Sequence, residues 1–214
     1  MIRCVTPEIL DSLEPEHPDA IGSRRDLRII NRLMGNRSWL LRQVAQLTDS
    51  RRYLEIGAGQ GALAKDLITR LSLTRYTALD FAPQPDDWPA TAHWVQGDLL
   101  SADCFQDADV LIASLILHHF TDDQLGVIGK RIEDSSVQTM LVCEPCRRGL
   151  HKLQLAAGRL IGFNHVTLHD GAVSIDAGFR RAELPQLLGL NPKAWQLSIE
   201  ENWMGAYRMS ASRI

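Results

Sequence analysis

No apolar run in this 214-residue sequence is long enough to cross a membrane. The longest, at residues 110–117, falls well short of the roughly 20 residues that a membrane-spanning helix needs. The first residues carry several acids and no apolar segment, so they do not resemble a secretory signal. These absences predict a cytoplasmic protein without a membrane partner.

Cysteine is scarce, and its spacing does not indicate a metal centre. Cys143 and Cys146 form a C-x-x-C pair, but no second pair follows at the spacing of a structural zinc site. Cys143 ends an apolar run, so we expect a buried, reduced thiol there. The sequence therefore predicts no bound metal.

An excess of positive charge is also missing. The net charge is −3, and the basic residues form only small groups, such as Arg24, Arg25, Arg28 and Arg32. An extended nucleic-acid surface usually needs a basic stripe. We therefore expect no nucleic-acid partner, and the composition leaves the oligomeric state open, a homodimer included.

The pattern of apolar residues changes along the chain. Residues 1–22 are rich in proline and acids and are predicted to form a loose arm. Helical spacing over residues 26–47 fits one long helix or two helices broken at Gly35. We expect strands at residues 52–56, 76–80, 93–95, 109–117, 139–143, 195–200 and 203–211. Helices are expected at residues 61–73, 122–133, 148–161 and 180–188, and a mixed segment at 162–179.

This alternation predicts an α/β domain with a mostly parallel sheet and helices on both faces. No internal repeat or low-complexity linker divides the chain. We therefore expect a single domain over residues 1–214, with an N-terminal helical cap at 1–48 and a catalytic core at 49–214.

A glycine-rich loop follows the first strand, in YLEIGAGQGALAKDL at residues 53–67. A dinucleotide loop would place its third glycine at position 62, but the third glycine is Gly61. No Lys-Ser or Lys-Thr follows, which excludes a P-loop. The loop is thus suited to a ligand other than a pyrophosphate.

Three acids flank this loop at strand ends. Asp80 ends the second strand, where a carboxylate can accept both hydroxyls of a ribose. Asp98 ends the third strand, where it could accept from an adenine amino group. Glu55 directly precedes the glycines; a carboxylate there would repel phosphates but attract an ammonium or sulfonium.

Together these motifs resemble those of the class I S-adenosylmethionine-dependent methyltransferases. LEIGAGQG is similar to the first family motif, TALDFAP to the second, QGDLL to the third and DVLIASLILHHF to the fourth. The resemblance implies a three-layer, Rossmann-like α/β fold with a mostly parallel seven-stranded sheet and an antiparallel last strand. The cofactor it implies is S-adenosylmethionine.

The resemblance also implies roles for individual residues. The glycine loop would pass over the methionine moiety, Asp80 would hold the ribose, and Ser114 would close the site. The implied cofactor residues are Glu55, Gly57, Ala58, Gly59, Gly61, Asp80, Phe81, Asp98, Leu99 and Ser114. Asp98 as a helix cap and Ser114 as a buried, satisfied hydroxyl remain alternative interpretations.

Histidines supply the candidates for a catalytic base. His118 and His119 follow the fourth strand, at the carboxyl edge where an acceptor should bind. His169 lies in a second cluster, NHVTLHDG, in the mixed segment. A phenolic acceptor titrates near 10, so a base would help it lose its proton. Glu144, at the end of the fifth strand, could orient a histidine or only cap a helix.

The acceptor class follows from missing motifs. Neither Asn-Pro-Pro-Tyr nor Pro-Cys, typical of methyltransferases that act on nucleic-acid bases, follows the fourth strand. NRLMGNRSWL, at residues 31–40, is loosely similar to bacterial methyltransferases of quinone and aromatic polyketide pathways; Met34, Trp39, Arg28 and Arg32 could line an aromatic pocket. We expect methyl transfer to an oxygen, or secondarily a carbon, of a small aromatic or polyketide-like metabolite. The alternatives are an RNA or protein methyltransferase, a non-catalytic module of the same fold and a nicotinamide-dependent oxidoreductase.

Overall fold

The computed structural model describes residues 1–14, 16–47 and 51–214. Its strands are β1 (Tyr53–Ile56), β2 (Tyr76–Asp80), β3 (His93–Gln96), β4 (Val110–Ser114), β5 (Thr139–Pro145), β6 (Trp195–Glu201) and β7 (Ala206–Arg213). They form one sheet in the order β3-β2-β1-β4-β5-β7-β6. Among these strands, β7 alone runs opposite to the other six, as the resemblance implies.

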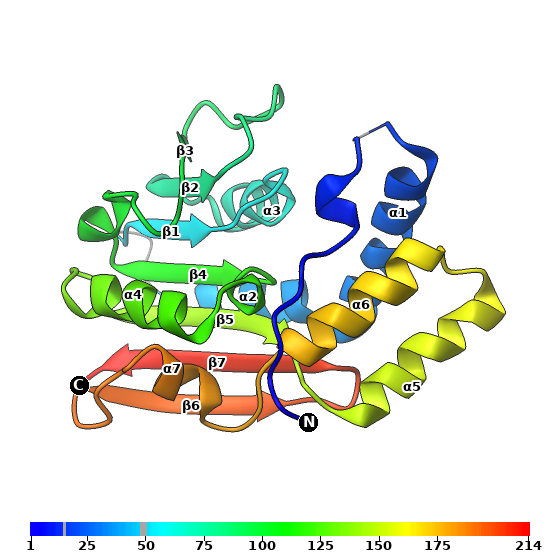
Figure 1. Cartoon of the computed structure of the whole chain (residues 1–214). Helices are drawn as coiled ribbons and strands as arrows, with labels where there is room; N and C mark the ends of the chain where they lie inside the picture. The colour runs from blue at the N-terminus through cyan, green and yellow to red at the C-terminus, as the bar shows by residue number, and fades with distance from the viewer. Residues whose placement is uncertain (15, 48–50) are drawn as a thin grey trace.

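The α-helices are α1 (Pro18–Met34), α2 (Asn36–Val44), α3 (Ala62–Leu71), α4 (Asp122–Glu133), α5 (Gly149–Ala157), α6 (His165–Ala177) and α7 (Glu183–Leu187). Short 3-10 turns are η1 (Leu10–Ser12), η2 (Cys104–Asp107), η3 (Leu117–His119) and η4 (Gly158–Ile161). Helices α4 and α7 lie on one face of the sheet, α2 and α3 on the other (Figure 1). No helix in the described part of the chain is long and apolar enough to span a bilayer.

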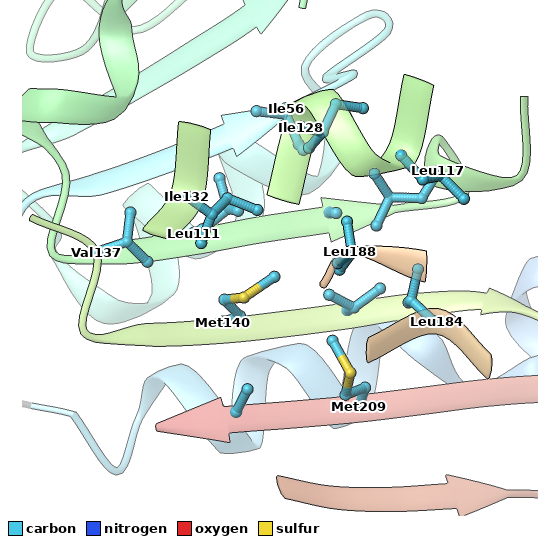
Figure 2. Close-up of a cluster of buried hydrophobic side chains, with 14 of the residues drawn as sticks. Ile56, Leu111, Leu117, Ile128, Ile132, Val137, Met140, Leu184, Leu188 and Met209 are labelled. Atoms are coloured by element: carbon cyan, nitrogen blue, oxygen red, sulfur yellow. The ribbon is translucent and has the colours of Figure 1, made fainter. Parts of the chain in front are cut away.

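Two apolar clusters fill the space between the sheet and its helices. Figure 2 shows Ile132 of α4 and Leu184 of α7 in one apolar cluster with Leu111 of β4 and Met140 of β5. The second cluster, on the opposite face, includes Trp39 of α2. Continuous burial along β4 and β5 explains their unbroken apolar sequence, because a parallel strand with helices on both faces has no solvent side.

The N-terminal segment differs from the expectation of a loose arm. Residues 1–14 run across the carboxyl edge of the sheet beside α6, and α1 already begins at Pro18 (Figure 1). The Arg3 guanidinium donates to the carbonyls of Phe120 (2.7 Å) and Ala177 (2.8 Å). The arm is therefore docked by polar contacts that a composition of proline and acids does not reveal.

Three further expectations need correction. Residues 162–179, expected to be mixed, contain the thirteen-residue helix α6, capped by the Asn164 side chain, which accepts from the Val166 N–H. The strand expected at 109–117 ends at Ser114, because Leu115 adopts a left-handed φ of 58°. Met34 and Trp39 are core residues, while Arg28 and Arg32 are exposed, so the expected aromatic pocket is not formed.

Other sequence expectations hold. Two helices meet at Gly35, whose φ of 71° ends α1. Cys143 and Cys146 are buried free thiols, and burial raises the pKa of both. The expected boundary between cap and core, at residues 48 and 49, lies outside the described residues, as does Pro15.

Candidate active site

The glycine loop after β1 is closely packed at Gly57 and has open space beside Gly59. Gly57, Gly59 and Gly61 all have left-handed φ angles, of 68°, 58° and 69°. A Cβ on Gly57 would lie 2.3 Å from the Ile116 side chain, whereas one on Gly59 would meet nothing within 4 Å. Only glycine adopts this path without strain, and the space beside Gly59 can admit a ligand. Ala58, between them, is buried in the second core cluster.

Asp80 connects this loop to the end of β2. Its carboxylate accepts hydrogen bonds from the Gly59 N–H (2.7 Å) and the Ala82 N–H (2.8 Å). The next residue, Phe81, leaves 68% of its surface exposed, although large apolar side chains are usually buried. The Asp80 carboxylate therefore contacts the glycine loop, and the exposed Phe81 ring follows it directly in the chain.

Asp98 and Leu99 lie at the end of β3. The Asp98 side chain accepts from the Leu100 N–H at 2.9 Å, so it caps a turn and not the helix that the alternative interpretation of the sequence expects. The Leu99 side chain is buried in the first core cluster. The second Asp98 oxygen has no hydrogen-bond partner among the described residues.

Glu55 is buried beneath the loop, with an exposed fraction of 2%. Its carboxylate accepts a hydrogen bond from the Tyr76 hydroxyl at 2.7 Å. The pKa of Glu55 is raised to about 7. Burial is the main cause and the Asp80 charge adds to it, while the hydrogen bond from Tyr76 acts in the opposite direction. The sequence identifies Tyr76 only as the first residue of a strand and does not predict its bond to Glu55.

Glu144 organises the turn after β4. This fully buried carboxylate accepts from the backbone N–H groups of Ile116 (3.1 Å) and Leu117 (2.8 Å). It also lies 2.7 Å from Nδ1 of His118. Glu144 thus both orients a histidine and caps a turn, the turn being η3 rather than the following helix.

The two neighbouring histidines have different surroundings. His118 is 4% exposed, and its Nε2 faces Oε1 of Glu8 at 3.7 Å. Burial would lower the pKa of His118, but the hydrogen bond to Glu144 and the nearby Glu8 carboxylate raise it to about 9. The His119 ring lies 4.2 Å away, and burial together with the His118 charge lowers its pKa. Neither ring nitrogen of His119 has a hydrogen-bond partner in the described part of the chain.

The N-terminal arm joins this pair to α6. Asp170 of α6, 2% exposed, accepts from the N–H groups of Ile9 and Leu10, each at 2.9 Å. The same carboxylate lies 2.8 Å from Nδ1 of His169, whose side chain is 50% exposed. His169 therefore supports the arm through Asp170. Sequence reasoning misses Glu8, because nothing in the arm signals which strand end it will reach.

No family model matches the chain, and no curated protein matches it in sequence. Solved structures do match. The plantazolicin methyltransferase BpumL, in complex with a triazolic desmethylPZN analog and SAH, superposes with a TM-score of 0.71 at 10% identity; the match covers 95% of this chain and 93% of that one. The chain has the fold of the class I methyltransferases.

Two further solved structures share this methyltransferase fold. The pyocyanin biosynthetic protein PhzM matches at a TM-score of 0.62 and 18% identity, over 97% of this chain and 62% of PhzM. The methyltransferase domain of the bacterial Hen1 protein CtHen1 matches at 0.59 and 16% identity, over 85% of this chain and all of that domain. The expected Rossmann-like fold is confirmed.

Proposed function

We propose that this protein transfers a methyl group from S-adenosylmethionine to an oxygen of a small aromatic or polyketide-like metabolite, with a carbon as the second choice of acceptor atom. The observation that carries the proposal is the glycine loop, open at Gly59 and joined to Asp80, within a methyltransferase fold. S-adenosylmethionine supplies an electrophilic methyl group on a sulfonium.

The residues around the loop fit that cofactor. Glu55 is a buried carboxyl below the glycines, so an ammonium or sulfonium nearby would stabilise its charged form. Asp80 would accept from the ribose and Phe81 would pack on the adenine. Gly57, Ala58, Gly59 and Gly61 would hold the methionine part, Asp98 and Leu99 would meet the adenine edge, and Ser114 would close the site.

A small-molecule acceptor is favoured by two lines of support. A solved structure of BpumL contains a triazolic desmethylPZN analog together with SAH, and PhzM is a biosynthetic protein by its name. The chain itself carries no basic stripe for a nucleic-acid backbone. We also propose that residues 1–48 act as a cap over the core at 49–214, since α1 packs on α6.

His119 is the preferred base for a hydroxyl acceptor. Both ring nitrogens of His118 face carboxylates, those of Glu144 and Glu8, which hold His118 in its protonated form, so it is poorly placed to accept a proton from the acceptor. His119 shares its position at the carboxyl edge of β4 and has no such partners among the described residues. His169 of α6, beside Asp170, is the third candidate.

Calorimetric titration tests the cofactor assignment. Full-length protein should bind S-adenosylhomocysteine with micromolar affinity and bind neither NADH nor NADPH. Asp80→Ala should weaken the binding, while Asp86→Ala, an acid on the neighbouring loop with no role in the site, should not. Binding of a dinucleotide instead would overturn the proposal.

Acceptor screening then separates the remaining functions. Turnover of phenolic or polyketide substrates, lost in His119→Ala with cofactor binding intact, supports the proposal. Cofactor binding without turnover on any acceptor favours a non-catalytic module. A salt-dependent shift on mixed RNA would favour a nucleic-acid substrate.

A further inference from the structure

Three side chains from distant parts of the chain converge at the end of β4. Glu8 comes from the N-terminal arm, and His118 and His119 come from η3. One ligand atom from each lies within 4.8 Å of those of the other two. The Glu8 Oε1 to His118 Nε2 distance is 3.7 Å, close to the roughly 3.4 Å that separates two ligands at about 2.1 Å from one tetrahedral ion.

The residues that hydrogen-bond to His118 and Glu8 are arranged like those that orient the ligands in known metal sites. A histidine that binds a metal almost always donates its other ring N–H to a carboxylate or carbonyl. Nδ1 of His118 lies 2.7 Å from the buried Glu144 carboxylate, which leaves Nε2 directed at Glu8. Glu8 in turn accepts a hydrogen bond from the Ser174 hydroxyl of α6. Both the imidazole and the carboxylate are thus held in fixed orientations.

We propose that Glu8, His118 and His119 bind a divalent transition-metal ion. Two carboxylates, those of Glu8 and Glu144, face the single ring of His118, and a protonated ring balances only one of their charges. A divalent ion that replaces the Nε2 proton, which is released to solvent, balances both. His119 contributes a ring nitrogen that has no hydrogen-bond partner among the described residues. A set of two imidazoles and one carboxylate leaves at least one coordination position open.

The donor atoms restrict the identity of the ion. Imidazole nitrogen suits zinc, iron, cobalt and nickel, whereas magnesium and calcium prefer oxygen ligands. Two of the three donors here are nitrogen. The site should therefore select a zinc-like ion over magnesium.

The ion would also change how the acceptor is activated, a step that rests on the proposed methyl transfer. The same His119 nitrogen can take a proton or bind a metal, but not both at once. With the ion bound, its charge would lower the pKa of an acceptor hydroxyl in the open position, and the proton would leave to solvent water. His119 would then act as a ligand, and Glu8 would determine whether the site is complete.

Cobalt(II) binding, measured by visible d–d absorption, tests the site on full-length protein carrying no histidine tag. Cobalt alone, without cofactor or acceptor, should saturate at one ion per chain, with zinc displacing it and magnesium failing to. Glu8→Gln and His119→Asn should each weaken binding by more than about 100-fold, since even outer-shell changes cost roughly 10–100-fold. Glu144→Gln should cost about 10–100-fold.

His165→Asn is the matched control, because His165 is an exposed histidine outside the cluster and should leave cobalt affinity unchanged. Far-ultraviolet circular dichroism confirms that each variant is folded. The proposal is overturned if cobalt does not bind the folded wild-type protein, if Glu8→Gln and His119→Asn bind it normally, or if magnesium competes equally. Because no cofactor is present, this outcome is independent of the S-adenosylhomocysteine titration.

Discussion

Glu55 is a carboxyl group that the fold keeps largely uncharged below neutral pH. Its pKa of about 7, against 4.5 as the ordinary value, arises chiefly from complete burial. A raised pKa means that the folded state binds the proton more tightly than the unfolded state does. The stabilisation is therefore complete below about pH 4.5 and is lost as the pH rises through 7.

Glu55→Gln should remove this pH dependence. The shift corresponds to about 3 kcal/mol of unfolding free energy between pH 4.5 and pH 8. The glutamine variant has no proton to exchange, so its stability should change less over that range and exceed that of wild type at pH 8. Urea unfolding at pH 5 and pH 8 measures this, and parallel curves for the two proteins would contradict it.

The glycine loop allows a matched pair of substitutions. Gly57→Ala adds a Cβ 2.3 Å from the Ile116 side chain in a left-handed backbone, so we expect a loss of about 2 kcal/mol or more in stability. Gly59→Ala meets open space and should cost only about 1 kcal/mol for its backbone angle.

Gly59→Ala, although the less destabilising of the two glycine variants, should lose affinity for the cofactor. The methyl group of Gly59→Ala lies where the proposed cofactor would pass, so S-adenosylhomocysteine affinity should fall at least about tenfold. Thermal unfolding and calorimetry on both variants test this. Unchanged affinity in Gly59→Ala would place the ligand elsewhere.

Among the helices, α6 connects the arm to the rest of the molecule. Asp170→Ala removes the acceptor for the Ile9 and Leu10 N–H groups, each worth roughly 1.5–3 kcal/mol as a charged hydrogen bond. We expect hydrogen exchange at these two amides to accelerate strongly while exchange in β4 stays slow. Asp176→Ala is the control on the same helix, because its carboxylate pairs with Lys152 at a half-exposed position.

The elements differ in how well their sequences predict them. Helix α4 has the predicted bounds because Thr121 and Gln124 form a capping box at its start. Helix α6 is missed because the arm, α1 and α5 contact it on several sides, which spreads its apolar residues around it. Gly171 suggests a loop in the sequence, yet a Cβ there would lie 2.8 Å from Leu155 of α5, so it permits close packing.

The candidate site shows the same contrast. The positions of Gly57, Gly59 and Asp80 follow from local signals, since glycine marks the left-handed turns and an acid ends the next strand. The roles of Glu8 and Tyr76 depend on contacts between residues far apart in sequence. No local pattern encodes such contacts, and only the folded structure identifies them.

For the whole molecule, the arm should matter more to the acceptor than to the cofactor. Deletion of residues 1–12 removes the contacts of Arg3 and Glu8 and should lower the unfolding free energy by several kcal/mol. Acceptor turnover should fall by more than tenfold, while S-adenosylhomocysteine affinity changes less than that, because the arm contacts η3 and α6 rather than the glycine loop. Equal losses in both would show that the arm also covers the cofactor.

The docked arm also has a consequence for the order of events during synthesis. Arg3 leaves the ribosome almost first, but Asp122, its partner, follows 119 residues later, and Asp170 is made 161 residues after Ile9. The arm therefore cannot dock until α6 and most of the sheet have been synthesised. Closing so long a loop earlier would cost entropy without forming these contacts. The Glu8 carboxylate therefore reaches His118 and His119 late in folding, so the complete cluster of these three side chains forms only when the rest of the domain has folded.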